Sequence, residues 1–320
     1  MRLEQQKTNL QIKSTSKAVK FVLKVREQKY LYLMSVPFVI WLIVFRYVPI
    51  WGWVMAFKKY KPGIPFADQQ WLGLSMFSEM FGDPQFYLAM RNTLVMSILG
   101  LIAGFAIPII FALMLNEIRS VMFKRTIQTI SYLPHFVSWV IAASIISKML
   151  SIDGGAINEL LLSLHIIKEP FSFLAEGKYF WAIVTISDIW KETGWNTIIY
   201  LAAMAGVDAS LYEAASADGA GRFRRMWHIT LPGIRSTIII LLVLGIGNLI
   251  SIGFEKQMLL QNPLVTDYST VLDLYILRYG IGLNRYSFGT AVGIFKSVIS
   301  VILLLLANKA AKKIGEGSVI

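Results

Sequence analysis

The stretch Glu213–Pro232, EAASADGAGRFRRMWHITLP, separates two long apolar runs and decides how the rest of the chain is interpreted. Ser210, three residues before this stretch, forms a Ser-x-x-Glu pair with Glu213, the capping box that begins many helices. Asp208 is an alternative N-cap, because a short carboxylate also accepts from the first free N–H groups. Several alanines follow and favour a helix. A short helix is therefore expected at the start of this stretch.

The second half of the stretch predicts a turn and a new helix. Gly219 and Gly221 end the first helix and permit a tight turn. Phe223 to Ile229 can resume as a helix, and Pro232 suits the first turn of a following spanning helix. We call residues 210–232 the elbow. The elbow is predicted to be either a helix–turn–helix docking element for a partner protein or an ordinary amphipathic helix between two spans.

Outside the elbow, long apolar runs dominate the 320 residues. Hydrophobic residues make up 56% and charged residues 16%, and the mean hydropathy is +0.59. A run of about 18 or more mostly apolar residues is typical of a membrane-spanning helix. The runs predict an all-α membrane protein with six transmembrane helices, at Tyr30–Phe57, Phe86–Asn116, Thr126–Met149, Phe180–Ala205, Ile234–Ile252 and Phe288–Asn308.

The basic residues indicate the orientation. More than half of the 31 Lys and Arg residues lie in four segments on one side of the predicted membrane. Lys and Arg are enriched in cytoplasmic flanks, so both termini and the elbow are expected in the cytoplasm. These segments are the N-terminal tail, Glu117–Arg125, Asp208–Arg235 and the C-terminal tail. The same surplus explains the net charge of +12 without nucleic acid, and such basic tails bind anionic membrane lipid.

Several kinds of chemistry are excluded. The chain has no cysteine, which removes disulfides, thiolate zinc sites and thiol catalysis. It has no phosphate-binding Gly-x-x-x-x-Gly-Lys-Ser/Thr loop, since Gly177-Lys178 is followed by Tyr179. Any ATP must therefore bind to another chain. About thirty polar and basic residues precede the first span, so the N-terminus is not expected to be a cleaved signal peptide.

The elbow resembles the EAA motif of permease subunits of binding-protein-dependent ABC importers. The matching residues, in the family's spacing, are Glu213, Ala214, Ala215, Gly219, Ile229, Leu231 and Pro232. The resemblance implies a type I ABC importer permease fold. It also implies that the elbow, including Asp218 and Gly221, is the coupling helix that docks into an ATPase subunit.

The resemblance also implies partners. Two ATPase subunits would bind ATP and Mg, this chain would bind no cofactor, and an extracytoplasmic solute-binding protein would deliver the substrate. A second permease subunit, usually a different chain, would complete the channel. The implied location is the bacterial cytoplasmic (inner) membrane, and the implied role is transport rather than catalysis.

Further segments resemble the polysaccharide branch of carbohydrate permeases, whose members import oligosaccharides from pectin, alginate or host glycans. These segments are Tyr47–Gly52, Asp188–Asn196, Tyr200–Ala203, Gly253–Leu264 and Tyr286–Gly293. The expected layout is a basic tail at 1–29, a first helix and external loop at 30–85, the core permease domain at 86–309 and a tail at 310–320.

The candidate substrate path lies in the fourth and fifth spans. Charged residues within a span are costly and usually face a protein interior or a watery cavity. Aromatic rings stack on sugars and amides bind hydroxyls. The candidates are Asp188, Trp190, Lys191, Glu192, Trp195, Asn196, Asn248 and Ser251.

Each candidate has a structural alternative. Lys191 and Asp188 are spaced to form an ion pair that locks neighbouring helices. Tryptophans also form interfacial belts, and Asn248 and Ser251 could simply bond a neighbouring helix. In the third span, His135 follows a proline and could satisfy a backbone carbonyl.

Other function classes remain open from the residues alone. A permease for a different solute class would share the elbow. A membrane-embedded enzyme is disfavoured, because the three histidines form no His-x-x-Glu-His cluster and no Gly-x-Ser-x-Gly is present. A self-sufficient carrier or channel would leave the seven-position pattern in the elbow unexplained.

Overall fold

The computed structural model describes residues 27–313, which are largely helical and form no strand beyond one isolated bridge between Lys58 and Trp71. Most of the predicted N-terminal tail and part of the C-terminal tail lie outside the described residues. The described residues form two compact units, one up to Met55 and the other from Ala56 onward.

The first unit contains most of the first predicted span. Its helix α3 (Lys29–Leu42) continues through a π-helical turn and then 3-10 turns to Phe57, giving 29 consecutive helical residues. Pro49, which has no N–H to donate, lies at the start of the 3-10 segment Val48–Phe57. No residue of α3 is buried within the chain. The expected span Tyr30–Phe57 is confirmed as a helix.

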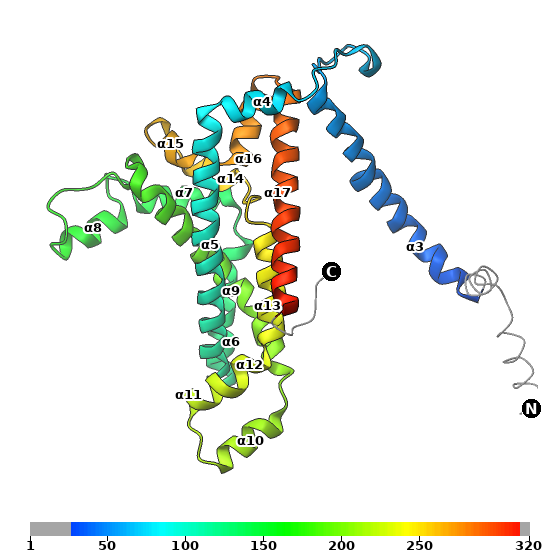
Figure 1. The fold of residues 1–320 in the computed structure, drawn as a ribbon. Coiled ribbons are helices and arrows are strands. Elements are labelled where there is room, and N and C mark those ends of the chain that lie inside the picture. Colours follow the sequence, from blue (N-terminus) through cyan, green and yellow to red (C-terminus); the bar gives the residue numbers. More distant parts are fainter. Residues whose placement is uncertain (1–26, 314–320) are drawn as a thin grey trace, which may run out of the picture. The chain divides into compact units, whose positions relative to one another are not determined.

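The second unit is organised around two helix pairs (Figure 1). Helix α5 (Pro84–Asn116) packs along α9 (Gly177–Ala205), and α13 (Arg235–Gly247) packs along α17 (Tyr286–Lys313). By length and composition, three helices of the described chain could cross a membrane, or up to six if each bent pair counts as one span. The expected all-α membrane fold is confirmed.

The third span is not one helix, contrary to the prediction of Thr126–Met149. Helix α6 (Val121–Tyr132) and helix α7 (Trp139–Met149) are bent by 102° at a 3-10 turn. Pro134 removes a donor from the helical ladder at this point. The hydroxyl of Ser138 then accepts from Ile141 N and starts α7 as its N-cap. The sequence contained both signals, but α6 and α7 together are apolar enough to pass for one span, which hid the break.

The fifth span is shorter than predicted, and the segment after it is more than a loop. Helix α13 ends at Gly247, before the expected end at Ile252, because Asn248 takes a non-helical conformation at its C-cap. The predicted orientation places residues 253–287, which separate the fifth and sixth spans, outside the membrane as a loop. They fold into a π-helical turn and three short helices, α14 (Glu255–Leu260), α15 (Thr266–Ser269) and α16 (Leu272–Tyr275).

These short helices pack into the core of the second unit. Leu272 and Tyr275 are fully buried. The backbone of this segment finds hydrogen-bond partners on α5. The side-chain amide of Asn92 donates to the carbonyls of Asp267 and Thr270, each at 2.9 Å. Buried backbone groups need such partners, so the polar residues of α5 explain why this segment folds inward. The other external segments contain α4 (Ser75–Gly82) and α8 (Ala156–Ser163).

Candidate functional site

The elbow begins with helix α10 (Ala209–Ala217), at the end of the second unit opposite α4 and α15 (Figure 1). Its N-cap is Asp208, whose side chain accepts from the backbone N–H of Ser210 at 2.9 Å. The alternative cap is therefore confirmed, and the Ser210–Glu213 capping box does not form because Ser210 already lies inside the helix. The backbone N–H of Ser210 and, to a smaller extent, its side chain form hydrogen bonds that lower the pKa of the Asp208 carboxyl.

Helix α10 ends in a Schellman motif centred on Gly219. Ala220 N donates to Ala215 O at 2.8 Å, and Gly219 N donates to Ser216 O at 3.1 Å. Gly219 has a φ of +72°, a conformation that glycine adopts without a steric penalty. The predicted turn is therefore confirmed, and it depends on this glycine.

The rest of the elbow returns to the membrane as helix. Helix α11 (Arg222–Arg225) continues through a π-helical turn into α12 (Leu231–Gly233), which contains Pro232. The predicted position of Pro232 in the first turn of the spanning helix is wrong, because α13 begins only at Arg235, after a bend of 59°. The two arms are tied together: the hydroxyls of Tyr212 and Thr230 are 2.9 Å apart, and Arg225 donates to Ser216 at 2.7 Å.

These ties leave the motif residues on the outside of the elbow. Glu213, Ala214, Asp218, Gly219, Gly221 and Pro232 are exposed, while Ala215, Ile229 and Leu231 are half-buried. Within residues 27–313, the side-chain carboxylate of Glu213 forms no hydrogen bond or ion pair. A carboxylate flanked by small residues on an exposed helix permits close approach of another surface. Nothing in the chain's own packing accounts for the glutamate.

A second candidate site is a cavity of about 320 Å³ among α5, α9, the end of α13 and α14. Five of the eight predicted path residues line it: Asp188, Glu192, Asn196, Asn248 and Ser251. The bend after α13 brings the last two toward the cavity. Amide, hydroxyl and carboxylate groups therefore meet in one hollow, which provides both hydrogen-bond donors and acceptors.

The charged residues of this region pair differently from the prediction. The expected Asp188–Lys191 pair is wrong, since Asp188 pairs with Lys256 of α14. Lys191 is buried and donates to Glu192 Oε1 at 3.1 Å and to the carbonyl of His135 at 2.7 Å. The break in the third span frees that carbonyl, which explains why Lys191 turns toward it.

Sequence reasoning missed Lys256 because it lies in a segment taken for a loop. The signal that could have revealed it is charge balance. Asp188 and Glu192 both lie within a span, and only Lys191 in that span can compensate them. Neutralising both carboxylates therefore requires a second cation from another part of the chain.

The remaining predicted residues do not line the cavity. Trp195 stacks on the ring of His135, with centroids 4.3 Å apart and planes 4° from parallel. Trp190 is 44% exposed. His135 also holds Glu192 through its Nδ1, at 2.7 Å from Oε2. This histidine therefore bonds a side chain as well as presenting its carbonyl to Lys191.

The chain is similar to known transport proteins. Residues 96–315 match the model of the family described as binding-protein-dependent transport system inner membrane component. The chain is 45% identical over 300 residues to the polygalacturonan/rhamnogalacturonan transport system permease protein YteP of Bacillus subtilis (strain 168), covering 94% of this chain and 93% of that protein.

Two solved structures are similar throughout. One is a bacterial ABC transporter involved in the import of the acidic polysaccharide alginate, with a TM-score of 0.82, 38% identity and coverage of 92% of this chain and 99% of that chain. The other is a bacterial alginate ABC transporter in complex with an alginate pentasaccharide-bound periplasmic protein, with a TM-score of 0.85, 38% identity and coverage of 92% and 98%.

Proposed function

The chain belongs to the family of inner-membrane components of binding-protein-dependent transport systems, and from this premise we propose that it carries oligosaccharides handed over by an extracytoplasmic binding protein. It is a multi-pass transport subunit of the inner membrane rather than an enzyme. The proposal concerns its cargo, its path and its coupling to ATP.

The observation that carries the cargo proposal is the 38% identity, over 92% of this chain, to a transporter chain crystallised with an oligosaccharide-loaded periplasmic protein. The cavity supports it. Its volume of about 320 Å³ is within the range of small-ligand sites, which begin near 300 Å³. Asn196, Asn248 and Ser251 offer groups that bind sugar hydroxyls. Because the named relatives handle pectic and alginate chains, the favoured cargo is an acidic oligosaccharide.

The coupling proposal rests on the elbow. Glu213 and the small residues beside it would seat in an ATPase subunit, and the turn at Gly219 would set the angle between the two arms. Two ATPase subunits would supply ATP and Mg, and a second permease subunit would complete the path.

The cargo is tested with the complete transporter in proteoliposomes. Acidic oligosaccharides from pectin and alginate are compared with neutral oligosaccharides of the same length, with the binding protein outside and ATP inside. We expect uptake of at least one acidic series that requires both the binding protein and ATP. Uptake restricted to another solute class would overturn the cargo, and uptake without the ATPase would favour a secondary carrier.

Coupling is tested by Glu213→Ala. Glu213 has no partner within the described chain, so folding should be unaffected. Loss of an interface hot spot typically costs about 2 kcal/mol or more, so uptake and cargo-stimulated ATP hydrolysis should fall about tenfold or more. Glu159→Ala, which removes an exposed carboxylate from α8, is the matched control and should change neither. Normal coupling in Glu213→Ala would refute the docking role.

A further inference from the structure

The side-chain amide of Gln257, on α14, lies in the core of the second unit without adequate hydrogen-bond partners. Its side chain is fully buried, and its Oε1 has no hydrogen-bond partner in the described chain. Its Nε2 faces only the sulfur of Met96, at 3.8 Å. A thioether is a weak acceptor, so neither end of the amide is properly paired. Buried polar groups in native proteins are rarely left in this state.

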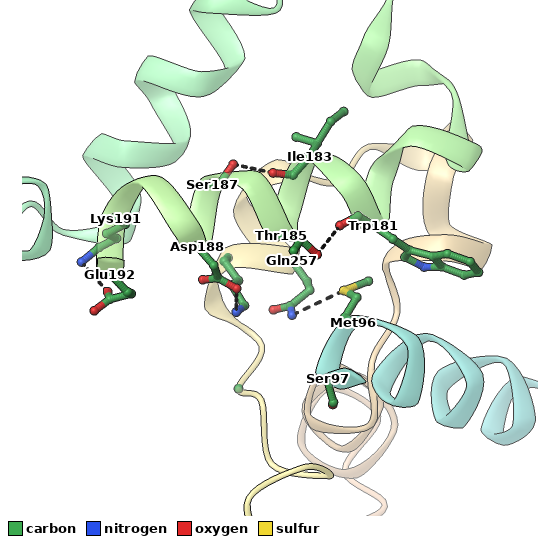
Figure 2. A network of polar contacts seen from close by, with 12 residues as sticks. Met96, Ser97, Trp181, Ile183, Thr185, Ser187, Asp188, Lys191, Glu192 and Gln257 are labelled. Atoms are coloured by element: carbon green, nitrogen blue, oxygen red, sulfur yellow. Dashed lines mark hydrogen bonds and ion pairs between the residues drawn. The ribbon is translucent and has the colours of Figure 1, made fainter. Parts of the chain in front are cut away.

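The amide lies directly behind the wall of the cavity. Met96, Thr185, Asp188 and Lys256 line that cavity, and Figure 2 shows the amide of Gln257 between Met96 and the helix carrying Thr185 and Asp188. The poorly paired amide of Gln257 therefore lies next to residues that line the proposed oligosaccharide path.

The element that carries Gln257 is attached unequally at its two ends. Leu260, at the C-terminal end of α14, is buried in an apolar cluster with Phe180, Val184 and Leu274. At the N-terminal end, α14 follows Gly253, whose φ is +76° and whose N–H donates to Asp273 Oδ2 at 3.0 Å; a Cβ added there would meet no atom within 4 Å. There the ion pair between Lys256 and Asp188 ties the helix to α9.

Packing alone does not explain an amide at this position. A methionine has nearly the same length and would fill the space without leaving polar atoms unpaired, and replacing such groups by apolar ones is often neutral or stabilising. Because the unpaired amide destabilises the resting state, its presence indicates that it forms hydrogen bonds in another state of the transporter.

We propose that Gln257 contacts the cargo: the first turn of α14 tilts away from α9 during transport and turns the amide into the cavity. There the amide donates to one sugar hydroxyl and accepts from another, which is what a hydroxyl-rich oligosaccharide requires and what an apolar side chain cannot provide. This inference rests on the proposed oligosaccharide cargo.

The test is Gln257→Met in the complete transporter, with uptake measured against cargo concentration and the thermal midpoint measured on the same preparation. We expect an unchanged or higher midpoint together with a KM for uptake raised about three- to tenfold, the effect of losing one or two hydrogen bonds. Ser300→Ala is the matched control, because Ser300 Oγ is the other buried unpaired side-chain atom in residues 27–313. It should leave both midpoint and KM unchanged.

The other outcomes are decisive as well. A stable Gln257→Met transporter with wild-type KM would overturn the inference. A lowered midpoint, repeated with Gln257→Leu, would show that the amide is structural and overturn it too. If the wild-type transporter imports no oligosaccharide at all, the proposed cargo has failed, which is distinguishable from failure of Gln257 alone.

Discussion

Gly194→Val should abolish the folded permease. Gly194 lies where α9 crosses the third span, and a Cβ built on it overlaps the backbone carbonyl of Ser131. Because the obstacle is backbone, a rotamer change cannot relieve the clash, and α6 and α9 would have to separate. Overpacking typically costs about 1–3 kcal/mol, and we expect this backbone clash to cost at least about 3 kcal/mol.

The measurement is the yield of assembled transporter extracted from membranes and its thermal midpoint in detergent. Gly293→Val is the matched control, since Gly293 also lies within a long helix, α17, but a Cβ there meets nothing within 4 Å. We expect Gly293→Val to assemble nearly normally. Equal yields of the two variants would mean that α6 and α9 are not in such close contact in the assembled protein.

The sequence predicted those features that depend on local chemistry. Gly219 takes the left-handed conformation expected of a turn, and Asp208 caps α10, because each residue acts on the backbone next to it. The apolar runs that predicted the second, fourth and sixth spans coincide with α5, α9 and α17, since burial or lipid contact of a whole helix needs only length and apolarity.

Features that depend on distant partners were not predictable in the same way. Hydropathy averaged over the third span does not detect its 102° bend, because α6 and α7 together are apolar enough to pass for one span. Likewise, the ion-pair partner of Asp188 is Lys256, which lies between two predicted spans and not within one. The inward fold of residues 253–287 depends on donors such as Asn92, far away in the sequence. The cavity is therefore a product of tertiary packing, although five of its lining residues were identified individually.

The second large effect concerns the pair Asp188–Lys256, which fastens α14 to α9. The side chains are only 26% and 17% exposed, so Lys256→Gln leaves an uncompensated carboxylate among the spans. Removing one partner of a buried pair costs about 3–5 kcal/mol, and the partial exposure of Asp188 to the cavity puts this case near 3. We expect a clearly lowered thermal midpoint of the assembled transporter.

The double variant Asp188→Asn/Lys256→Gln separates the pair from its members. Two neutral amides of similar size can bond each other, so most of the lost stability should return, and the deviation from additivity measures the coupling. Lys178→Gln is the control, because its pair with Glu176 is 3.9 Å long and exposed at both ends, and such pairs contribute about 0–1 kcal/mol. If Lys256→Gln is as mild as Lys178→Gln, or if the two charge-removing changes simply add, the ion pair does not hold α14 in place. The tilt proposed for that helix would then have to be limited by its apolar contacts at Leu260 instead.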